Sequence, residues 1–437
     1  MPLWLTILSI PLLIGAIGTL VFYGVVALRV LRSMRTLPTA RDGLALAELV
    51  SDWPELTVII PAHNERDVIA RAARSLLASN YHDLGVVFVL DRCTDDTEAV
   101  LREAIRMPDG SPDPRVEIIV NDHCPEGWAG KVHAMHRGYR ESKRLDGSRS
   151  PDEGDWTLKP GEEIHDLSRG LVLFADADTE FDPACLRAAV ALLVERDVDL
   201  LSLLSTLTID EWYERYIQPV ASFELIRQFP LDQVNDPAKP RLFANGQFML
   251  FRRAAFDSIG GHAGVRGALL EDIQFSKIFA QKGRGLRLNC LLADGMLRCE
   301  MYRAYEAFER GWKRIYTESA SRRPARLRAS ARRLVITGAV FPVLTEIAFW
   351  VALAALLLSG SSATALTLAI ASGLGAIAFT VAMGLVYRQQ HQPIWRILLV
   401  PWGAWVVAGL LRGAARDLTR GTQTQWGGRS YSREVQS

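Results

Sequence analysis

Two long stretches without a charged residue, 1–28 and 347–387, constrain this 437-residue chain more than any other feature. Within the first stretch, residues 3–28 form one apolar run. A helix of that length reaches about 39 Å at about 1.5 Å per residue, and a bilayer's hydrocarbon core is about 30 Å thick. The run is too long for the hydrophobic region of a signal peptide and follows no basic segment. We therefore predict an uncleaved N-terminal transmembrane anchor over 1–33, which excludes a wholly soluble protein.

The charges beside these stretches predict the orientation of the chain. Arginines follow the first run directly, so the positive-inside rule places the next domain in the cytoplasm; they are Arg29, Arg32, Arg35 and Arg41. We expect a multi-pass protein of the cell (inner) membrane, with C-terminal membrane segments over 334–411 and a cytoplasmic tail over 412–437. The stretch 394–411 is short and contains Arg396 and Pro401, and we expect it to be re-entrant or interfacial rather than spanning.

Overall composition excludes several other classes of protein. The formal net charge of +1 gives no global reason to bind nucleic acid. The five cysteines are scattered and odd in number, which argues against a disulfide framework or a zinc site.

The middle of the chain, 54–300, alternates short apolar runs with helical patterns. The compact apolar runs are typical of buried parallel strands, and they lie at 56–61, 86–90, 116–120 and 171–175. Repeated strand–helix units predict an α/β domain with a doubly wound sheet. Such a sheet binds its ligand at the carboxyl ends of its strands.

Polar residues follow three of these strands at that edge. The first strand runs into PAHNE at 61–65, the second into DRCTDDT at 91–97, and the fourth into Asp176 and Asp178. An Asp-x-Asp pair alone is more often a solvated loop. After a buried strand, its two carboxylates are suited to a divalent ion, Mg²⁺ or Mn²⁺, that bridges a diphosphate.

These motifs, followed by Leu270-Glu271-Asp272, together resemble the family 2 glycosyltransferases of the GT-A (Rossmann-like) fold over 54–300. The resemblance implies that Asp272 is the catalytic base and that Asp176 and Asp178 face the sugar diphosphate and its metal. It also implies that the nucleotide pocket is lined by Pro61, Glu65 and Asp91. Acidic residues also favour helix N-termini in any protein, so a capping role for Glu271 and Asp272 is the alternative.

The segment GWAGK at 127–131 extends the resemblance to one subfamily. It looks like the GW-x-GK segment of the subfamily that acts on lipid acceptors, which includes the hopanoid-associated and carotenoid-acid glycosyltransferases. That likeness implies a nucleotide-sugar donor, a UDP-sugar above others, and an isoprenoid-type lipid acceptor in the bilayer. A cation beside glycines suits a phosphate site, so we assign Lys131 to donor binding; an ordinary helix-start lysine is the alternative.

Between the predicted domain and the second uncharged stretch, residues 301–333 combine aromatic residues at helical spacing with a basic run at 322–333. We expect an interfacial amphipathic segment on the membrane surface, although such a stripe can equally be core packing. Glu271, Trp312 and Tyr316 are accordingly placed on the acceptor side.

Two other functions remain open from the sequence. A processive polysaccharide synthase would share the domain, but the Q-x-x-R-W motif of cellulose- and chitin-type synthases is absent. A catalytically silent membrane scaffold could also keep the nucleotide-binding fold. In such a scaffold the acidic residues of the motifs would be expected to be replaced, whereas all four aspartates are present.

Overall fold

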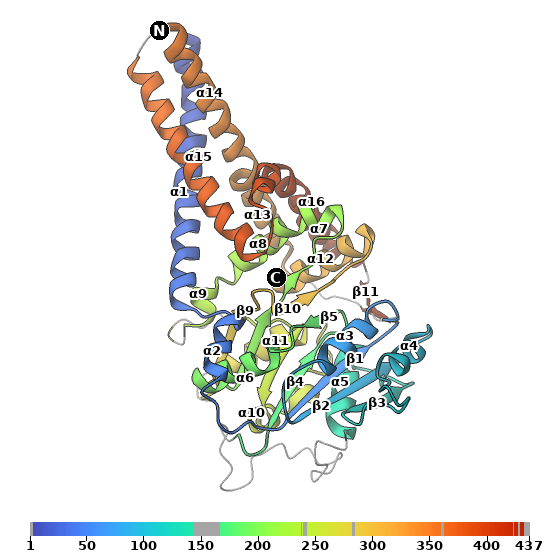
Figure 1. Ribbon diagram of the computed structural model, residues 1–437. Helices are drawn as coiled ribbons and strands as arrows, with labels where there is room; N and C mark the ends of the chain where they lie inside the picture. The colour runs from blue at the N-terminus through green and yellow to red at the C-terminus, as the bar shows by residue number, and fades with distance from the viewer. Residues whose placement is uncertain are drawn as a thin grey trace.

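The computed structural model describes residues 3–142, 167–236, 238, 243–281, 285–359, 362–422, 424–426 and 429–431. An α/β domain carries three long helices that project from it (Figure 1). A seven-stranded sheet, ordered β3-β2-β1-β4-β8-β6-β9, forms the centre of the domain, beside a small sheet ordered β5-β10-β7 and a hairpin of β11 and β12. The strands are β1 (Leu56–Ala62), β2 (Leu84–Asp91), β3 (Val116–Asn121), β4 (Leu171–Ala175), β5 (Thr179–Phe181), β6 (Leu200–Leu204), β7 (Thr206–Leu207), β8 (Phe248–Arg252), β9 (Leu288–Leu292), β10 (Leu297–Cys299), β11 (Thr424–Trp426) and β12 (Arg429–Tyr431).

Four neighbouring strands of the large sheet confirm the predicted parallel core. β3, β2, β1 and β4 pair in parallel, and β1, β2 and β4 are buried along their whole length. Strand β8 differs from the expectation, because it runs antiparallel to both β4 and β6. Its residues FMLFR are as apolar as those of its parallel neighbours, so strand direction could not be read from composition.

Helices cover both faces of the sheet, which explains why its strands read as continuous apolar runs. One face packs on α3, α4 and α6, and the other packs on α5, α10 and α11. Helix α5 lies close to the sheet because a Cβ on Gly138 would stand 2.6 Å from Ile59 Cγ2. The helices of the domain are α2 (Gly43–Ala47), α3 (Ile69–Leu77), α4 (Thr97–Ala104), α5 (Gly130–Glu141), α6 (Cys185–Glu195), α7 (Trp212–Tyr216), α8 (Gln218–Gln228), α9 (Leu231–Val234), α10 (Arg253–Ser258) and α11 (Glu271–Phe279), with 3-10 turns η1 (Ala40–Asp42) and η2 (Gly261–Val265).

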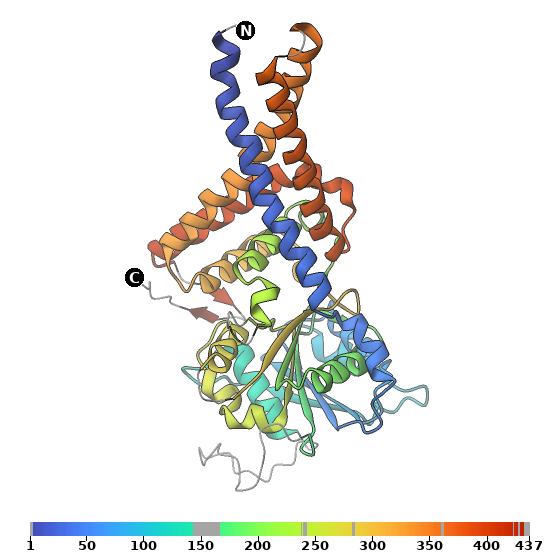
Figure 2. The ribbon, with the colours of Figure 1, turned by 90° about the vertical axis from the view of Figure 1, so that its left-hand side faces the viewer.

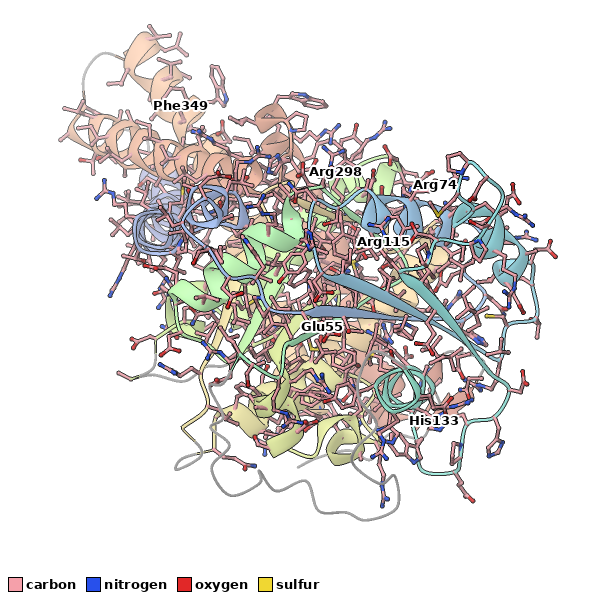
Figure 3. All side chains as sticks on the ribbon, turned by 60° about the horizontal axis from the view of Figure 1, so that its bottom comes forward. Glu55, Arg74, Arg115, His133, Arg298 and Phe349 are labelled. Atoms are coloured by element: carbon pink, nitrogen blue, oxygen red, sulfur yellow. The ribbon has the colours of Figure 1, made fainter. Side chains whose placement is uncertain are left out.

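The remaining helices form a second layer on one side of the domain. Helices α1, α14 and α15 run side by side away from the sheet, while α13 and α16 lie across their base (Figure 2). Phe349 of α14 lies well away from the sheet (Figure 3). The elements are α1 (Leu3–Thr36), α12 (Tyr305–Ser319), α13 (Pro324–Leu334), the π-helix η3 (Val335–Val340), α14 (Phe341–Ser359), α15 (Ala363–Gln389), the 3-10 helix η4 (Ile394–Leu399) and α16 (Val400–Thr419).

Among the described residues, four helical segments are long and apolar enough to cross a membrane. They begin in α1, α13, α15 and η4, which agrees with the apolar stretches of the sequence. Helix α16 continues to Thr419, so Arg412 and Arg416 belong to this helix rather than to the tail expected from 412. Gly338 of η3 allows α16 to approach closely, because a Cβ there would lie 2.8 Å from Ala404 Cβ.

The prediction that Trp312 and Tyr316 lie at the membrane interface was wrong. The exposed fraction of Trp312 is 2% and that of Tyr316 is 0%, and both pack in a core shared with α8 and α16. Tyr316 also donates a hydrogen bond to the carbonyl oxygen of Ala221 in α8 at 3.0 Å. The physical reason is that α13 and α16 cover the aromatic face of α12, and the sequence could not show which surface that face would meet.

Because Trp312 is buried, Trp312→Ala should lower the free energy of unfolding by about 3–5 kcal/mol, the usual cost of truncating a buried aromatic side chain. Denaturant unfolding in mild detergent measures this loss. Trp350→Ala is the control, since 62% of Trp350 is exposed on α14 and its loss should cost much less. Equal stability of the Trp312→Ala variant and the wild type would contradict the packing described here.

Candidate active site

The loops after β1 and β2 hold each other in place through side chains of the two sequence motifs. The backbone N–H of Thr94 donates to Asn64 Oδ1 at 2.8 Å, and that of Glu65 donates to Thr97 Oγ1 at 2.8 Å. Asn64 has a φ of 58°, a conformation that asparagine tolerates better than most residues. Pro61 is buried in β1, beyond the last residue that pairs with β4, and is in register with Val89 of β2. These contacts hold the motif residues together at the carboxyl ends of β1 and β2.

Asp91 ends β2 in a pocket of polar partners. Its Oδ1 accepts a hydrogen bond from Asn121 Nδ2 at 2.5 Å, and its Oδ2 lies 2.6 Å from Arg92 Nη2. Gly130 leaves room for this pair, because a Cβ would lie 2.6 Å from Arg92 Nη2 and 3.3 Å from Asp91 Oδ2 and would require the arginine to shift. The glycine of the GWAGK segment thus lets the start of α5 approach the residue predicted to bind the nucleotide.

Lys131, in the first turn of α5, bridges two carboxylates from different elements. Its Nζ lies 2.6 Å from Asp176 Oδ1, after β4, and 2.9 Å from Glu271 Oε1, at the start of α11. Although burial opposes it, these two charges raise the pKa of Lys131, so the lysine stays protonated. An ordinary surface lysine at a helix start would make no such contacts, and the geometry places Lys131 within the site.

Asp272 is held rigidly beside this bridge. Its Oδ2 accepts from the backbone N–H of Gly246 at 2.9 Å, and its Oδ1 accepts from that of Ile273 at 2.7 Å. Burial and the neighbouring charge of Glu271 raise the pKa of Asp272 to about 7. A carboxylate with a pKa near neutrality is suited to accept a proton at physiological pH.

Three further carboxylates gather at the ends of β1 and β4. Burial, and then the charge of Asp176, raise the pKa of Asp178 to about 7. Burial, and then the charges of Asp178 and Asp176, raise that of Glu65 to about 8. Asp178 Oδ1 is buried and has no hydrogen-bond partner among the described residues. Buried carboxylates with unbalanced negative charge and an unsatisfied oxygen fit a divalent cation.

No group of three or more His, Cys, Asp or Glu side chains is placed to hold a metal in the described part of the chain. A cation at Asp176 and Asp178 would therefore need further oxygen ligands from the donor diphosphate or from water. Mg²⁺ is usually bound in this way, by one or two carboxylates and substrate phosphates.

A cavity of about 190 Å³ opens beside these charged groups. Lys131, Asp176, Glu271 and Asp272 line its polar end. The rest of its wall mixes apolar and polar side chains. The apolar ones include Leu204, Leu225, Ile226, Leu269, Met301 and Trp312, and the polar ones include Gln218, Asp294, Arg314, Gln389, Gln390 and Gln392. Pro61, Glu65, Asp91 and Asp178 are not among the lining residues, so this cavity does not include those residues of the strand ends.

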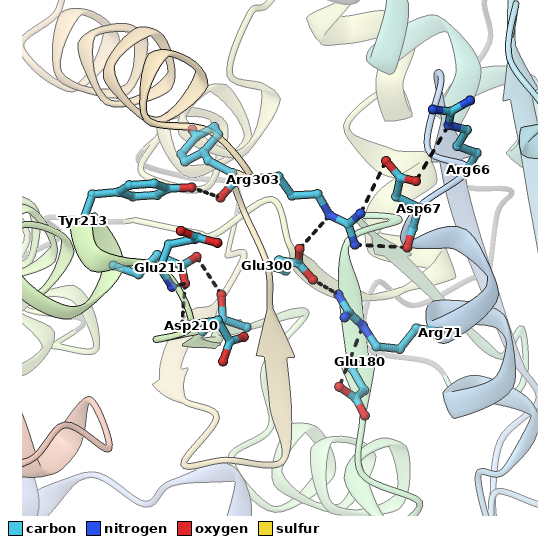
Figure 4. A network of polar contacts seen from close by, with 12 residues as sticks. Arg66, Asp67, Arg71, Glu180, Asp210, Glu211, Tyr213, Glu300 and Arg303 are labelled. Carbon is cyan, nitrogen blue, oxygen red and sulfur yellow. Dashed lines mark hydrogen bonds and ion pairs between the residues drawn. The ribbon is translucent and has the colours of Figure 1, made fainter.

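A chain of ion pairs ties the nucleotide-side loops to the segment that leads into α12 (Figure 4). Glu300 lies 2.7 Å from Arg71 of α3 and 2.6 Å from Arg303. Arg303 in turn lies 3.3 Å from Asp67. These contacts fix the start of α12 against α3 and the residues just before it.

Sequence reasoning missed two residues of the site. Asn121 ends β3 as Asp91 ends β2, and the rule about strand ends could have found it. Gly246 lies in a loop before β8, and a Cβ there would stand 3.2–3.3 Å from Glu271 Oε1, Asp272 Oδ2 and Lys131 Nζ. No sequence signal marks Gly246, because its importance arises from the close approach of α5 and α11.

The α/β sheet, with an acidic cluster and a bridging lysine at its strand ends, agrees with a glycosyltransferase of the GT-A class. The family model for glycosyltransferase-like family 2 matches residues 54–288, more than half of the chain. The chain belongs to this family. No curated protein matches the sequence closely enough to be counted as a relative.

Several solved structures are similar to this chain. The mannosyltransferase PcManGT from Pyrobaculum calidifontis, in complex with GDP-Man and Mn²⁺, has 17% identity and a TM-score of 0.46, with 95% of this chain and 99% of that chain covered. S. aureus TarS 1-349 in complex with UDP-GlcNAc has 13% identity and a TM-score of 0.36 over 87% and 96%. Glucosyl-3-phosphoglycerate synthase from Mycobacterium tuberculosis has 16% identity and a TM-score of 0.35 over 65% and 84%. These TM-scores lie below 0.5, so the family assignment rests on the family model.

Gly246→Ala should lower kcat by about tenfold or more, because the added methyl group must displace Asp272 or Lys131 by a few tenths of an ångström. Steady-state transfer assays measure this loss, and the stability of the variant should stay close to that of the wild type. Gly373→Ala is the matched control, since nothing lies within 4 Å of a Cβ at that position. Unchanged kcat in the Gly246→Ala variant would show that the contact is not critical.

Proposed function

We propose that the protein is a membrane-bound inverting glycosyltransferase that moves one sugar from a nucleotide-sugar donor, a UDP-sugar, to an isoprenoid-type lipid acceptor. The observation that carries the proposal is the cavity itself. It is lined by the charged groups of Asp272 and Lys131 and also by apolar side chains, such as Leu225 and Ile226 of α8. An acceptor with a polar head and an apolar body matches both kinds of lining.

In the proposed reaction, the acceptor hydroxyl attacks the anomeric carbon from the side opposite the leaving diphosphate. Asp272 accepts the hydroxyl proton as the new bond forms. Its two backbone hydrogen bonds hold it in one orientation, and Lys131 offsets negative charge on the leaving group. A single displacement by one base inverts the configuration at the anomeric carbon.

A divalent ion, Mg²⁺ or Mn²⁺, would be held by Asp178 and Asp176 together with the donor diphosphate. When bound, such an ion neutralises the charge of the diphosphate and makes it a better leaving group. On the nucleotide side, Asp91 and Glu65 would line the pocket for the base and ribose, with Pro61 shaping the strand end. Glu271 then orients Lys131 rather than contacting the acceptor directly.

The membrane arrangement supports this proposal. Helix α1 leads directly into the domain and carries at its C-terminal end most of the arginines that predict a cytoplasmic side. Helices α1, α14 and α15 project as a bundle, and α16 lies across their base (Figure 2). That orientation of α16 favours an interfacial or re-entrant segment, and the sequence has no Q-x-x-R-W motif of the processive synthases. Transfer of one sugar is therefore favoured over processive synthesis.

The function can be tested by incubating membranes that contain the protein with radiolabelled UDP- and GDP-sugars and resolving the lipid extract. A labelled lipid should form with the wild type, and Asp272→Asn should reduce it by about 10²-fold or more, the usual scale for a lost base. Transfer by the wild type should rise with pH through about 7, because Asp272 must be deprotonated and its pKa is raised to that value.

The matched control for the Asp272→Asn variant is donor binding measured by calorimetry, which should remain nearly intact. Label that enters only water-soluble products would contradict the lipid acceptor. Wild-type turnover of the Asp272→Asn variant would contradict the assignment of the base.

Donor binding should require a divalent ion through Asp176 and Asp178. A chelator should weaken binding to the wild type, and Asp178→Asn should weaken it with the metal present, because one carboxylate ligand is lost. Asp109→Asn, an exposed change outside the site, should keep both the affinity and the chelator sensitivity. Full-strength binding in the presence of chelator would show that this pair does not hold a metal.

A further inference from the structure

A second and larger cavity, of about 650 Å³, lies between the N-terminal helix and the rest of the helical layer. One wall is a stripe of α1, and the opposite wall comes from α8, α9, η3 and α15. The stripe of α1 consists of Gly18, Val21, Phe22, Val25, Val26, Arg29, Val30 and Ser33. At about 1.5 Å per residue, this stripe is roughly 22 Å long.

The two cavities are adjacent. Both are lined by Ile226 of α8, Leu292 of β9, and Gln389 and Gln390 at the end of α15. These four residues, called the neck below, stand between the two cavities, and Ile226 and Leu292 among them are half-buried. The cavity beside Asp272 therefore adjoins one that runs along a helix apolar enough to cross a membrane.

The outer side of the second cavity is open. Val21 and Val25 line it and yet are 60% and 49% exposed. Within a candidate membrane span, exposed apolar side chains face lipid rather than water. Polar groups stand near the cytoplasmic end of this cavity, where Arg29 is exposed and Arg227 pairs with Glu224 at 2.6 Å.

We propose that this cavity is the tail site of the acceptor: a single apolar chain lies along α1 in the groove, passes the neck, and presents its hydroxyl to Asp272. The inference rests on the proposed lipid acceptor and adds where its tail binds and how it enters, sideways from the bilayer past the exposed side chains of Val21 and Val25 on α1. The apolar lining, the lateral opening and the closeness to the catalytic cavity all select an amphipathic chain. The neck, formed by a few side chains, selects one chain rather than a two-chain lipid.

A tail site makes activity depend on acceptor length. Each methylene that becomes buried improves affinity by up to about fourfold. With a homologous series of primary alcohols in detergent, KM should therefore fall steeply as the chain lengthens, until the groove is filled. Val25→Trp fills the groove and should raise KM for the longest alcohols by about tenfold or more, the cost of losing burial of two methylenes. The loss should grow with chain length, because short alcohols fit beside the carboxylates.

Leu28→Trp is the matched control. Leu28 lies one turn further along the same helix, is 69% exposed and is absent from the lining of either cavity. The Leu28→Trp variant should keep the wild-type dependence of KM on chain length. Equal behaviour of the Val25→Trp and Leu28→Trp variants would overturn the tail site.

A binding measurement separates this inference from the proposed function. A photoreactive long-chain alcohol should label the α1 peptide that contains Val21 and Val25, and unlabelled long-chain alcohol should compete. Such labelling in a protein that makes no glycolipid would leave the tail site standing and contradict the acceptor. Glycolipid synthesis with labelling spread over the outer faces of α14 and α15 would support the proposed acceptor and overturn the tail site.

Discussion

The ion bridge of Lys131 with Asp176 and Glu271 is the interaction on which the site depends. It joins the start of α5, the end of β4 and the start of α11, three elements that are far apart in the sequence. Buried charges are tolerated only when paired, so these elements must meet in one arrangement. Gly130 and Gly246 permit that meeting, because each lies where a Cβ would collide with the charged groups.

The same bridge sets the chemistry of its neighbours. Glu271 neutralises Lys131 in part and at the same time raises the pKa of Asp272, so one acidic residue serves the cation and the base together. On the other side, burial and neighbouring carboxylates raise the pKa values of Asp178 and Glu65, so the negative charge of their ionised forms is not fully compensated. A divalent cation fits such a group of carboxylates.

The acceptor side depends on how the helical layer rests on the domain. Helix α12 buries its aromatic face against α8 and α16, and ion pairs through Glu300 and Arg303 fix its start to α3 and to Asp67 just before it. This support holds the cavity beside Asp272 next to the groove along α1. The arrangement is the one that the proposed bilayer-bound acceptor would require.

The sequence by itself determined the strands β1 to β4, the long apolar helices and the family, because buried parallel strands and membrane spans leave continuous apolar runs, and strand ends collect the ligand-binding residues. The local motifs also predicted a set of site residues, since each member lies in one of them: Asp91, Asp176, Asp178, Lys131 and Asp272. Only the tertiary structure decided that β8 is antiparallel, that Trp312 and Tyr316 are buried, and that Asn121 and Gly246 belong to the site. Those features arise from contacts between distant segments, and local patterns of hydrophobicity and charge do not specify which distant surface an apolar face or a small residue will meet.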